Sequence, residues 1–132
     1  EILHPHLPEF LRQYRFFFNP IRYTSLDLAL LEAMLIGMPV VGMATTEMAT
    51  VIKNDVSGYV HTDPAYLISK MRRLLEDRSL ATRIGSEGKK VAMERFNIER
   101  FILDWKNLFE IVIAKNRNAS SLLETSEISL GF

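Results

Sequence analysis

The sequence predicts an α/β fold, with parallel strands and helices on both faces of the sheet. Residues 28–36 are rich in strong helix formers and apolar nearly all the way round, which favours a helix buried in a core. Gly37 suits the end of that helix, and Pro39 prevents its continuation. The short apolar run 40–43 then indicates a buried parallel strand. From Pro64 onward the apolar spacing follows the helical period of about 3.6 residues.

The other expected elements are short and alternate along the chain. Aromatic residues favour a strand over 15–19, and Pro20 ends its ladder. Turn-forming residues at 54–58 separate a short helix from a third strand. The expected helices cover residues 7–14, 24–36, 48–53, 64–76, 79–95 and 98–115, and the expected strands cover residues 15–19, 40–43 and 59–62.

The domain organisation follows from the strand count and the last stretch. Three strands are too few for a complete doubly wound sheet, which typically has about five or six. The chain also begins with Glu1 rather than Met, so we expect a piece of a longer polypeptide whose missing strands precede it. Residues 1–115 then form part of one domain. Residues 116–132 are Ser-rich and weakly patterned, which predicts a flexible tail.

Composition excludes several classes of protein. Sixteen acids balance 16 Lys plus Arg, so no overall field attracts nucleic acid, although local basic clusters leave peripheral contact with a membrane open. The absence of cysteine excludes disulfides and fits a cytoplasmic location. No apolar stretch reaches the ~18 residues of a membrane span. His4 and His6 have no Cys or acid at ligand spacing, so no metal site is expected.

Glu32 is the only charge in the apolar helical run. A carboxylate in a core loses hydration, which is costly unless a partner or a ligand satisfies it. Two interpretations follow from the residues alone. Glu32 is either a structural partner of an upstream Arg or Lys, or an acid that binds a ligand.

The loop before this helix suits an anion. Ligands of open parallel sheets bind at the carboxyl ends of the strands, where this loop would lie. Thr24 and Asp27 match a capping box, and the amides of the first helical turn would face a phosphate with the hydroxyls of Thr24 and Ser25. Glu32 lies eight residues beyond Thr24, or ~12 Å along a helix. A sugar–diphosphate–nucleoside spans that kind of distance.

The chain also resembles the C-terminal half of retaining GT-B glycosyltransferases of the family 4 type, the glycosyl transferases group 1. The segments that carry the resemblance are RYTSLDLALLEAM (22–34), GMPVV (37–41), NDVSGY (54–59) and ERFNI (94–98). Each segment alone is weakly specific, but the set in this order is specific, and the resemblance covers roughly residues 7–115. It implies the distal half of a Rossmann-like GT-B C-terminal domain, followed by C-terminal helices.

The resemblance implies roles for four donor-binding residues. Glu32 corresponds to the family's second glutamate, which holds the ribose hydroxyls of the donor nucleotide. Thr24 stands where the first glutamate, which contacts the donor sugar, is expected. Ser25 and Leu26 would offer backbone amides to the phosphates. Asp27 stands where a glycine usually lets the backbone approach the donor, so Thr24 and Asp27 are departures from the pattern.

The implied activity belongs to a longer parent protein. It would transfer a sugar from a nucleotide-diphosphate sugar to a glycan or lipid-linked acceptor with retention, in polysaccharide biosynthesis, without a metal cofactor. The basic residues that neutralise the leaving diphosphate and the acceptor-binding domain would lie upstream. No catalytic residue is therefore expected within this chain, which alone should be inactive. Two alternatives remain: a nucleotide-sugar epimerase of the same architecture, and a non-catalytic module that binds a nucleotide sugar or a protein.

Overall fold

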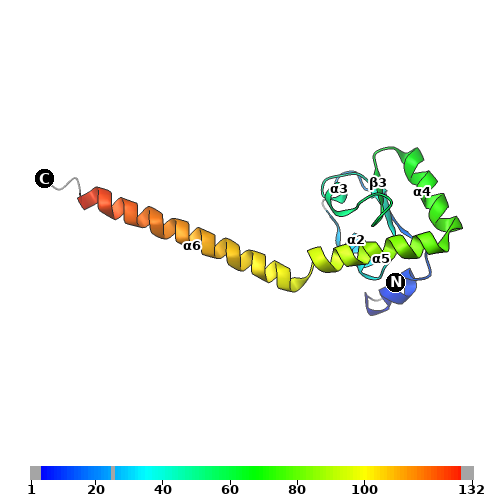
Figure 1. Ribbon diagram of the computed structural model, residues 1–132, viewed down its shortest axis with the longest axis horizontal. Coiled ribbons are helices and arrows are strands. Elements are labelled where there is room, and N and C mark those ends of the chain that lie inside the picture. The colour runs from blue at the N-terminus through cyan, green and yellow to red at the C-terminus, as the bar shows by residue number, and fades with distance from the viewer. Residues whose placement is uncertain (1–3, 25, 129–132) are drawn as a thin grey trace. The chain divides into compact units, whose positions relative to one another are not determined.

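The computed structural model describes residues 4–24 and 26–128. The chain divides into two compact units, Glu1–Arg95 and Phe96–Phe132. The first unit holds the sheet and the helices that pack on it, and the second contains one long helix (Figure 1).

A sheet of three parallel strands forms the centre of the first unit. The strands are β1 (Phe17–Asn19), β2 (Val40–Met43) and β3 (Tyr59–His61), in the spatial order β1-β2-β3. Phe17 is paired with Val40, and Val41 with Tyr59. The predicted parallel sheet and the places of its strands in the chain are confirmed.

Helices cover both faces of this sheet, as predicted (Figure 1). Val40 and Val60 face one core cluster, which includes residues of α2 (Leu28–Leu35), α3 (Met48–Val51) and the last turns of α5 (Arg78–Arg95). Val41 and Tyr59 face the other cluster, which includes residues of α4 (Pro64–Glu76) and the first turns of α5. Alternate strand residues thus reach opposite layers. The helices of this unit are a short 3-10 turn (His4–His6), α1 (Leu7–Leu11), α2 (Leu28–Leu35), α3 (Met48–Val51), α4 (Pro64–Glu76) and α5 (Arg78–Arg95).

The prediction that the apolar helix is buried all round is wrong. Leu30, Ala33 and Met34 of α2 are fully buried, but Leu28 is 77% exposed and Leu35 is 44% exposed. The sheet and α5 pack on α2. Apolar composition indicates that a helix is able to be buried, whereas the number of elements packed around it decides how many of its sides are buried.

The start of α2 differs from the prediction, and its end agrees with the prediction. Asp27, not Thr24, is the N-cap, and its Oδ1 accepts a hydrogen bond from the Leu30 amide at 2.7 Å. The end at Gly37 is confirmed, with φ of +80°. The Gly37 amide donates to Met34 at 2.9 Å and the Met38 amide donates to Ala33 at 2.9 Å, which together make a Schellman motif.

The turn predicted at 54–58 is confirmed and joins α3 to β3. The Asn54 side chain bonds the Val60 backbone twice, donating to its carbonyl at 3.0 Å and accepting from its amide at 2.8 Å. Ser57, which is 2% exposed, accepts from the Lys53 amide at 2.9 Å. Asp55 adopts φ of +62°, in the left-handed region that Asp tolerates better than most residues.

Lys70 does not belong to a solvated helix face, although its neighbours Arg72 and Arg73 on α4 are exposed. Its side chain is only 12% exposed and bonds Asp55 at 3.0 Å. Its ammonium group also lies over the rings of Tyr59 and Tyr66, at 4.8 and 5.0 Å from their centroids. The hydrogen bond from Lys70 holds the pKa of Asp55 below its ordinary value. The ion pair therefore ties α4 to the turn before β3.

We predict that Lys70→Met lowers the free energy of unfolding at pH 7 by about 1–2 kcal/mol, the scale of a partly desolvated cation–π contact with an ion pair. Because the pKa of Asp55 is lowered in the folded state, the ion pair's contribution is present above the ordinary carboxyl pKa. It is lost as the pH falls through the folded pKa, so the difference between the two proteins should shrink in acid. Denaturant titrations at neutral and acidic pH test this.

Arg72→Met is the matched control, because Arg72 is exposed on the same helix. It should change stability little at either pH. A Lys70→Met effect as small as that of the control would contradict the assigned role of Lys70.

The second unit contains α6 (Ile98–Ile128). Asn97 caps it, accepting from the Arg100 amide at 2.7 Å. Phe101, Trp105 and Phe109 are exposed and follow one another along one side, with ring centroids 6.1 and 5.5 Å apart. The helix continues beyond its predicted end at Lys115, because no Pro or Gly interrupts the sequence before Gly131.

The division into a domain over 1–115 and a flexible tail over 116–132 stays a prediction, and residues 129–132 lie outside the described part of the chain. Within the described ranges, no helix combines the length and the apolar character needed to cross a membrane.

Candidate functional site

Two loops lie at the carboxyl edge of the sheet, which is the edge where open parallel sheets bind their ligands. One loop follows Asn19 at the end of β1 and leads to α2, and the other follows Met43 at the end of β2 and leads to α3. The Thr46 hydroxyl joins them by donating to the Thr24 carbonyl at 2.7 Å. Thr46 adopts φ of +38°, an unusual conformation for a β-branched residue. The hydrogen bond between Thr46 and Thr24 therefore holds the two loops together at this edge.

Asn19 fixes the start of α2, and the sequence analysis did not single it out. It is 4% exposed, and its Nδ2 donates to Asp27 Oδ2 at 2.7 Å. Its own Oδ1 accepts from the Ile21 amide at 3.1 Å. The sequence signal was a polar residue at the end of an aromatic strand, directly before Pro20.

Asp27 uses both carboxylate oxygens within the protein. Oδ2 accepts from Asn19, and Oδ1 accepts from the amide of Leu30. The carboxylate is thus held as a helix cap at the position where the resemblance implied close approach of the backbone to a diphosphate. The predicted capping box, with Thr24 as the N-cap and Asp27 reaching back to it, is wrong, because Asp27 itself is the N-cap.

Glu32 is half-buried on α2. Because the helix begins at Leu28, Glu32 lies five residues after the cap, or ~7.5 Å along the axis, instead of the ~12 Å from Thr24 that was expected. Its side chain lines a hollow of about 210 Å³ whose other walls are apolar. The residues around it are Leu7, Pro8, Leu11, Leu35 and Ile36.

The other three predicted donor-binding residues belong to the loop before α2. Thr24 is half-buried and accepts from Thr46 through its carbonyl. The side chain of Leu26 packs against the core cluster that contains Leu30 and Met34, which leaves its backbone as the part able to meet a ligand. Ser25 lies outside the described residues.

Metal-binding side chains do not gather in the described ranges. No group of three or more His, Asp or Glu residues there is placed to hold a metal ion. His61, at the end of β3, stacks on Tyr66 with centroids 4.5 Å apart, and its Nδ1 accepts from the Asp63 amide at 2.9 Å. These contacts give His61 a structural part in the loop after β3.

The fold and its carboxyl-edge loops define an α/β domain of the kind that binds ligands where parallel strands end. The family model for glycosyl transferases group 1 matches residues 2–77, which is more than half of the chain. The chain therefore belongs to the glycosyl transferases group 1 family. Among curated proteins, none matches this sequence.

Solved structures with the same fold include several glycosyltransferases. Sucrose-phosphate synthase from Thermosynechococcus elongatus matches with a TM-score of 0.75 and 23% identity, over 87% of this chain and 29% of that one. TarM from S. aureus, in complex with UDP and other ligands, matches with a TM-score of 0.72 and 22% identity, over 79% and 22%. The C-terminal domain of LpcC from Francisella tularensis, a glycosyl transferase group 1 family protein, matches with a TM-score of 0.64 and 19% identity, over 74% and 51%.

These likenesses show the fold of a GT-B C-terminal domain. The chain spans less than a third of the length of the sucrose-phosphate synthase and TarM chains, and about half of the LpcC domain.

Proposed function

We propose that this chain binds the nucleotide part of a nucleotide-diphosphate sugar at the carboxyl edge of its sheet. In the full-length protein it would contribute to transfer of the sugar, with retention, to a glycan or lipid-linked acceptor. The observation that carries the proposal is Glu32 on α2, one turn behind the loop at the carboxyl edge, in a chain of this family. The complex of TarM with UDP supports a nucleotide as ligand.

Glu32 is assigned the ribose of the donor. A hydrogen bond that a sugar hydroxyl donates to this charged acceptor would be strong. The distance of ~7.5 Å along the axis from the helix start to Glu32 suits the separation of a ribose from the phosphate next to it. It is too short for the whole length of a nucleotide sugar.

The diphosphate is assigned to the backbone of residues 24–26. The amide of Leu30, the third residue of α2, already donates to the Asp27 carboxylate. The phosphates would therefore contact the loop before Asp27 rather than this amide. The dipole of α2 still favours an anion near its amino end. The cations that neutralise the leaving group, and the acceptor site, would come from residues outside this chain, which by itself should not catalyse transfer.

A non-catalytic module is the second candidate, favoured by one observation. Thr24 stands where the family has an acid that contacts the donor sugar, and its carbonyl is engaged with Thr46. A full-length protein that binds a nucleotide sugar yet forms neither a transfer nor a hydrolysis product would support this candidate. An epimerised donor in the absence of acceptor would support the epimerase instead.

The test of the proposed site is a calorimetric titration of the full-length protein with UDP-, GDP- and ADP-sugars. One donor class should bind, and Glu32→Gln should weaken its binding by about tenfold or more, since a hydrogen bond to a charged group is lost. Glu76→Gln is the matched control, because Glu76 is an exposed residue at the end of α4, and it should leave affinity unchanged. Unchanged donor affinity in Glu32→Gln would contradict the role of Glu32.

A further inference from the structure

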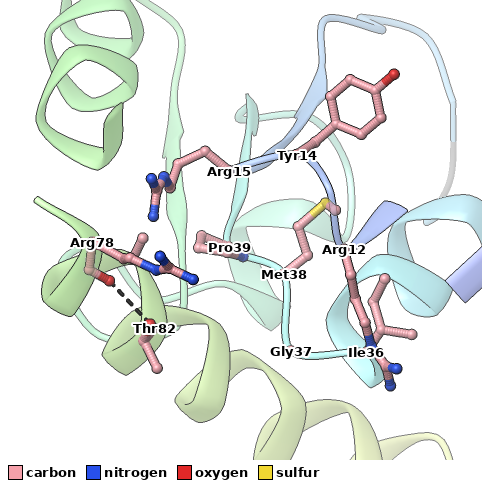
Figure 2. A pocket seen from close by; sticks show the side chains of 10 residues that line it. Arg12, Tyr14, Arg15, Ile36, Gly37, Met38, Pro39, Arg78 and Thr82 are labelled. Carbon is pink, nitrogen blue, oxygen red and sulfur yellow. Dashed lines mark hydrogen bonds between the residues drawn. The ribbon is translucent and has the colours of Figure 1, made fainter. Parts of the chain in front are cut away.

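A second hollow lies at the amino edge of the sheet, away from the loops of the candidate donor site. Its volume is about 170 Å³, and Gly37, Met38 and Pro39, which lead into β2, line it (Figure 2). Arg12 and Arg15, which lie between α1 and β1, and Arg78, the first residue of α5, also line it. We call this hollow, with its three arginines, the amino-edge arginine pocket.

The amino-edge arginine pocket carries positive charge without acidic lining. In Figure 2 Arg15 and Arg78 extend toward one side of the hollow, and Arg12 lies on the other side. Within the described part of the chain, none of these three arginines forms an ion pair. Asp77 precedes Arg78, but its Oδ1 caps α5 by accepting from the Leu80 amide at 2.9 Å.

Positive charges that line one hollow repel one another, and an anion bound between them would offset this repulsion. Arg12 and Arg78 are exposed, whereas Arg15 is half-buried. The amino end of α5 adds a favourable dipole for negative charge. The electrostatics of the pocket therefore favour an anionic ligand.

The size of the pocket restricts the anion. Pockets for drug-sized ligands are roughly 300–1,000 Å³, so 170 Å³ suits a single small group rather than a nucleotide. Guanidinium groups match the oxygens of phosphate in pairs of parallel hydrogen bonds. We propose that the amino-edge arginine pocket binds a phosphate monoester group, as a second ligand site distinct from the donor site.

A phosphate monoester is present both in small metabolites and in the headgroup of phosphatidic acid. Two binding measurements on the full-length protein at low ionic strength separate these sources. One is calorimetric titration with glycerol 3-phosphate, and the other is co-sedimentation with phosphatidylcholine vesicles that contain or lack phosphatidic acid. Thermal unfolding of every variant checks that it is folded.

The double variant Arg15→Gln with Arg78→Gln should weaken binding by at least about tenfold, equal to about 1.4 kcal/mol. Arg72→Gln removes one exposed charge outside the pocket and should have no such effect. Arg12→Gln alone gives a second variant if the double variant does not fold.

Binding of glycerol 3-phosphate supports a soluble ligand, and binding of only the vesicles with phosphatidic acid supports a lipid headgroup. Binding to neither probe, or binding equal in wild type and pocket variants, would overturn the proposal.

Discussion

Replacement of Gly85 by alanine should lower the free energy of unfolding by about 3 kcal/mol or more, the upper range for overpacking in a core. Gly85 is buried in α5, and an added Cβ would overlap the carbonyl group of Gly37 and approach Pro39 Cδ at 3.1 Å. The obstacle is backbone, and the Schellman motif holds it in place. In an unhindered helix the same substitution stabilises by about 1 kcal/mol, so the sign of the effect is diagnostic.

Ser86→Ala is the control, because Ser86 is the next residue on the same helix and is exposed. It should be neutral or slightly stabilising through helix propensity. Thermal and denaturant unfolding followed by circular dichroism measure both variants. A Gly85→Ala protein as stable as wild type would show that α5 does not approach the end of α2 as closely as described.

Asp27→Ala should have the second-largest effect, a loss of about 2–4 kcal/mol of stability. The N-cap of α2 contributes about 1 kcal/mol. The buried Asn19 amide would also lose its partner, at a cost of about 1–3 kcal/mol. Because the loop of the candidate donor site connects these two residues, donor affinity should fall as well.

Asp27→Asn separates the cap from the charge. Its side-chain oxygen still caps Leu30 or accepts from Asn19, but the NH2 group that replaces the second carboxylate oxygen cannot accept a hydrogen bond. We expect a loss between zero and that of Asp27→Ala, measured by denaturant unfolding. Equal stability of all three proteins would contradict the assigned role of the Asn19–Asp27 hydrogen bond.

Local signals predicted the parts of the fold that depend on neighbouring residues. Gly37 followed by Pro39 ended α2 because a left-handed residue and a missing amide act within one turn. The apolar run Val40–Met43 gave β2 with the bounds that the structure has. The start of α2 was misassigned because Thr24 and Asp27 are both good caps, and the choice between them depends on Asn19 in β1.

Contacts between distant residues account for what the sequence did not predict. Lys70 is shielded because β3 and its turn bring Tyr59 and Asp55 to α4. The amino-edge arginine pocket joins Arg12 and Arg15 to Arg78, which are more than 60 positions apart in the sequence. For the candidate site, Glu32 was singled out by its place in an apolar run, whereas its apolar neighbours from α1 required the folded chain.

Hydrogen–deuterium exchange of the full-length protein, with and without the donor that titration identifies, tests the central claim most directly. Binding at the carboxyl edge should slow exchange in peptides that cover residues 20–35, the loop after β1 and helix α2. Peptides from α4, on the other face of the sheet, should exchange at unchanged rates. Donor binding that leaves exchange in residues 20–35 unaltered would show that this edge is not the nucleotide-sugar site.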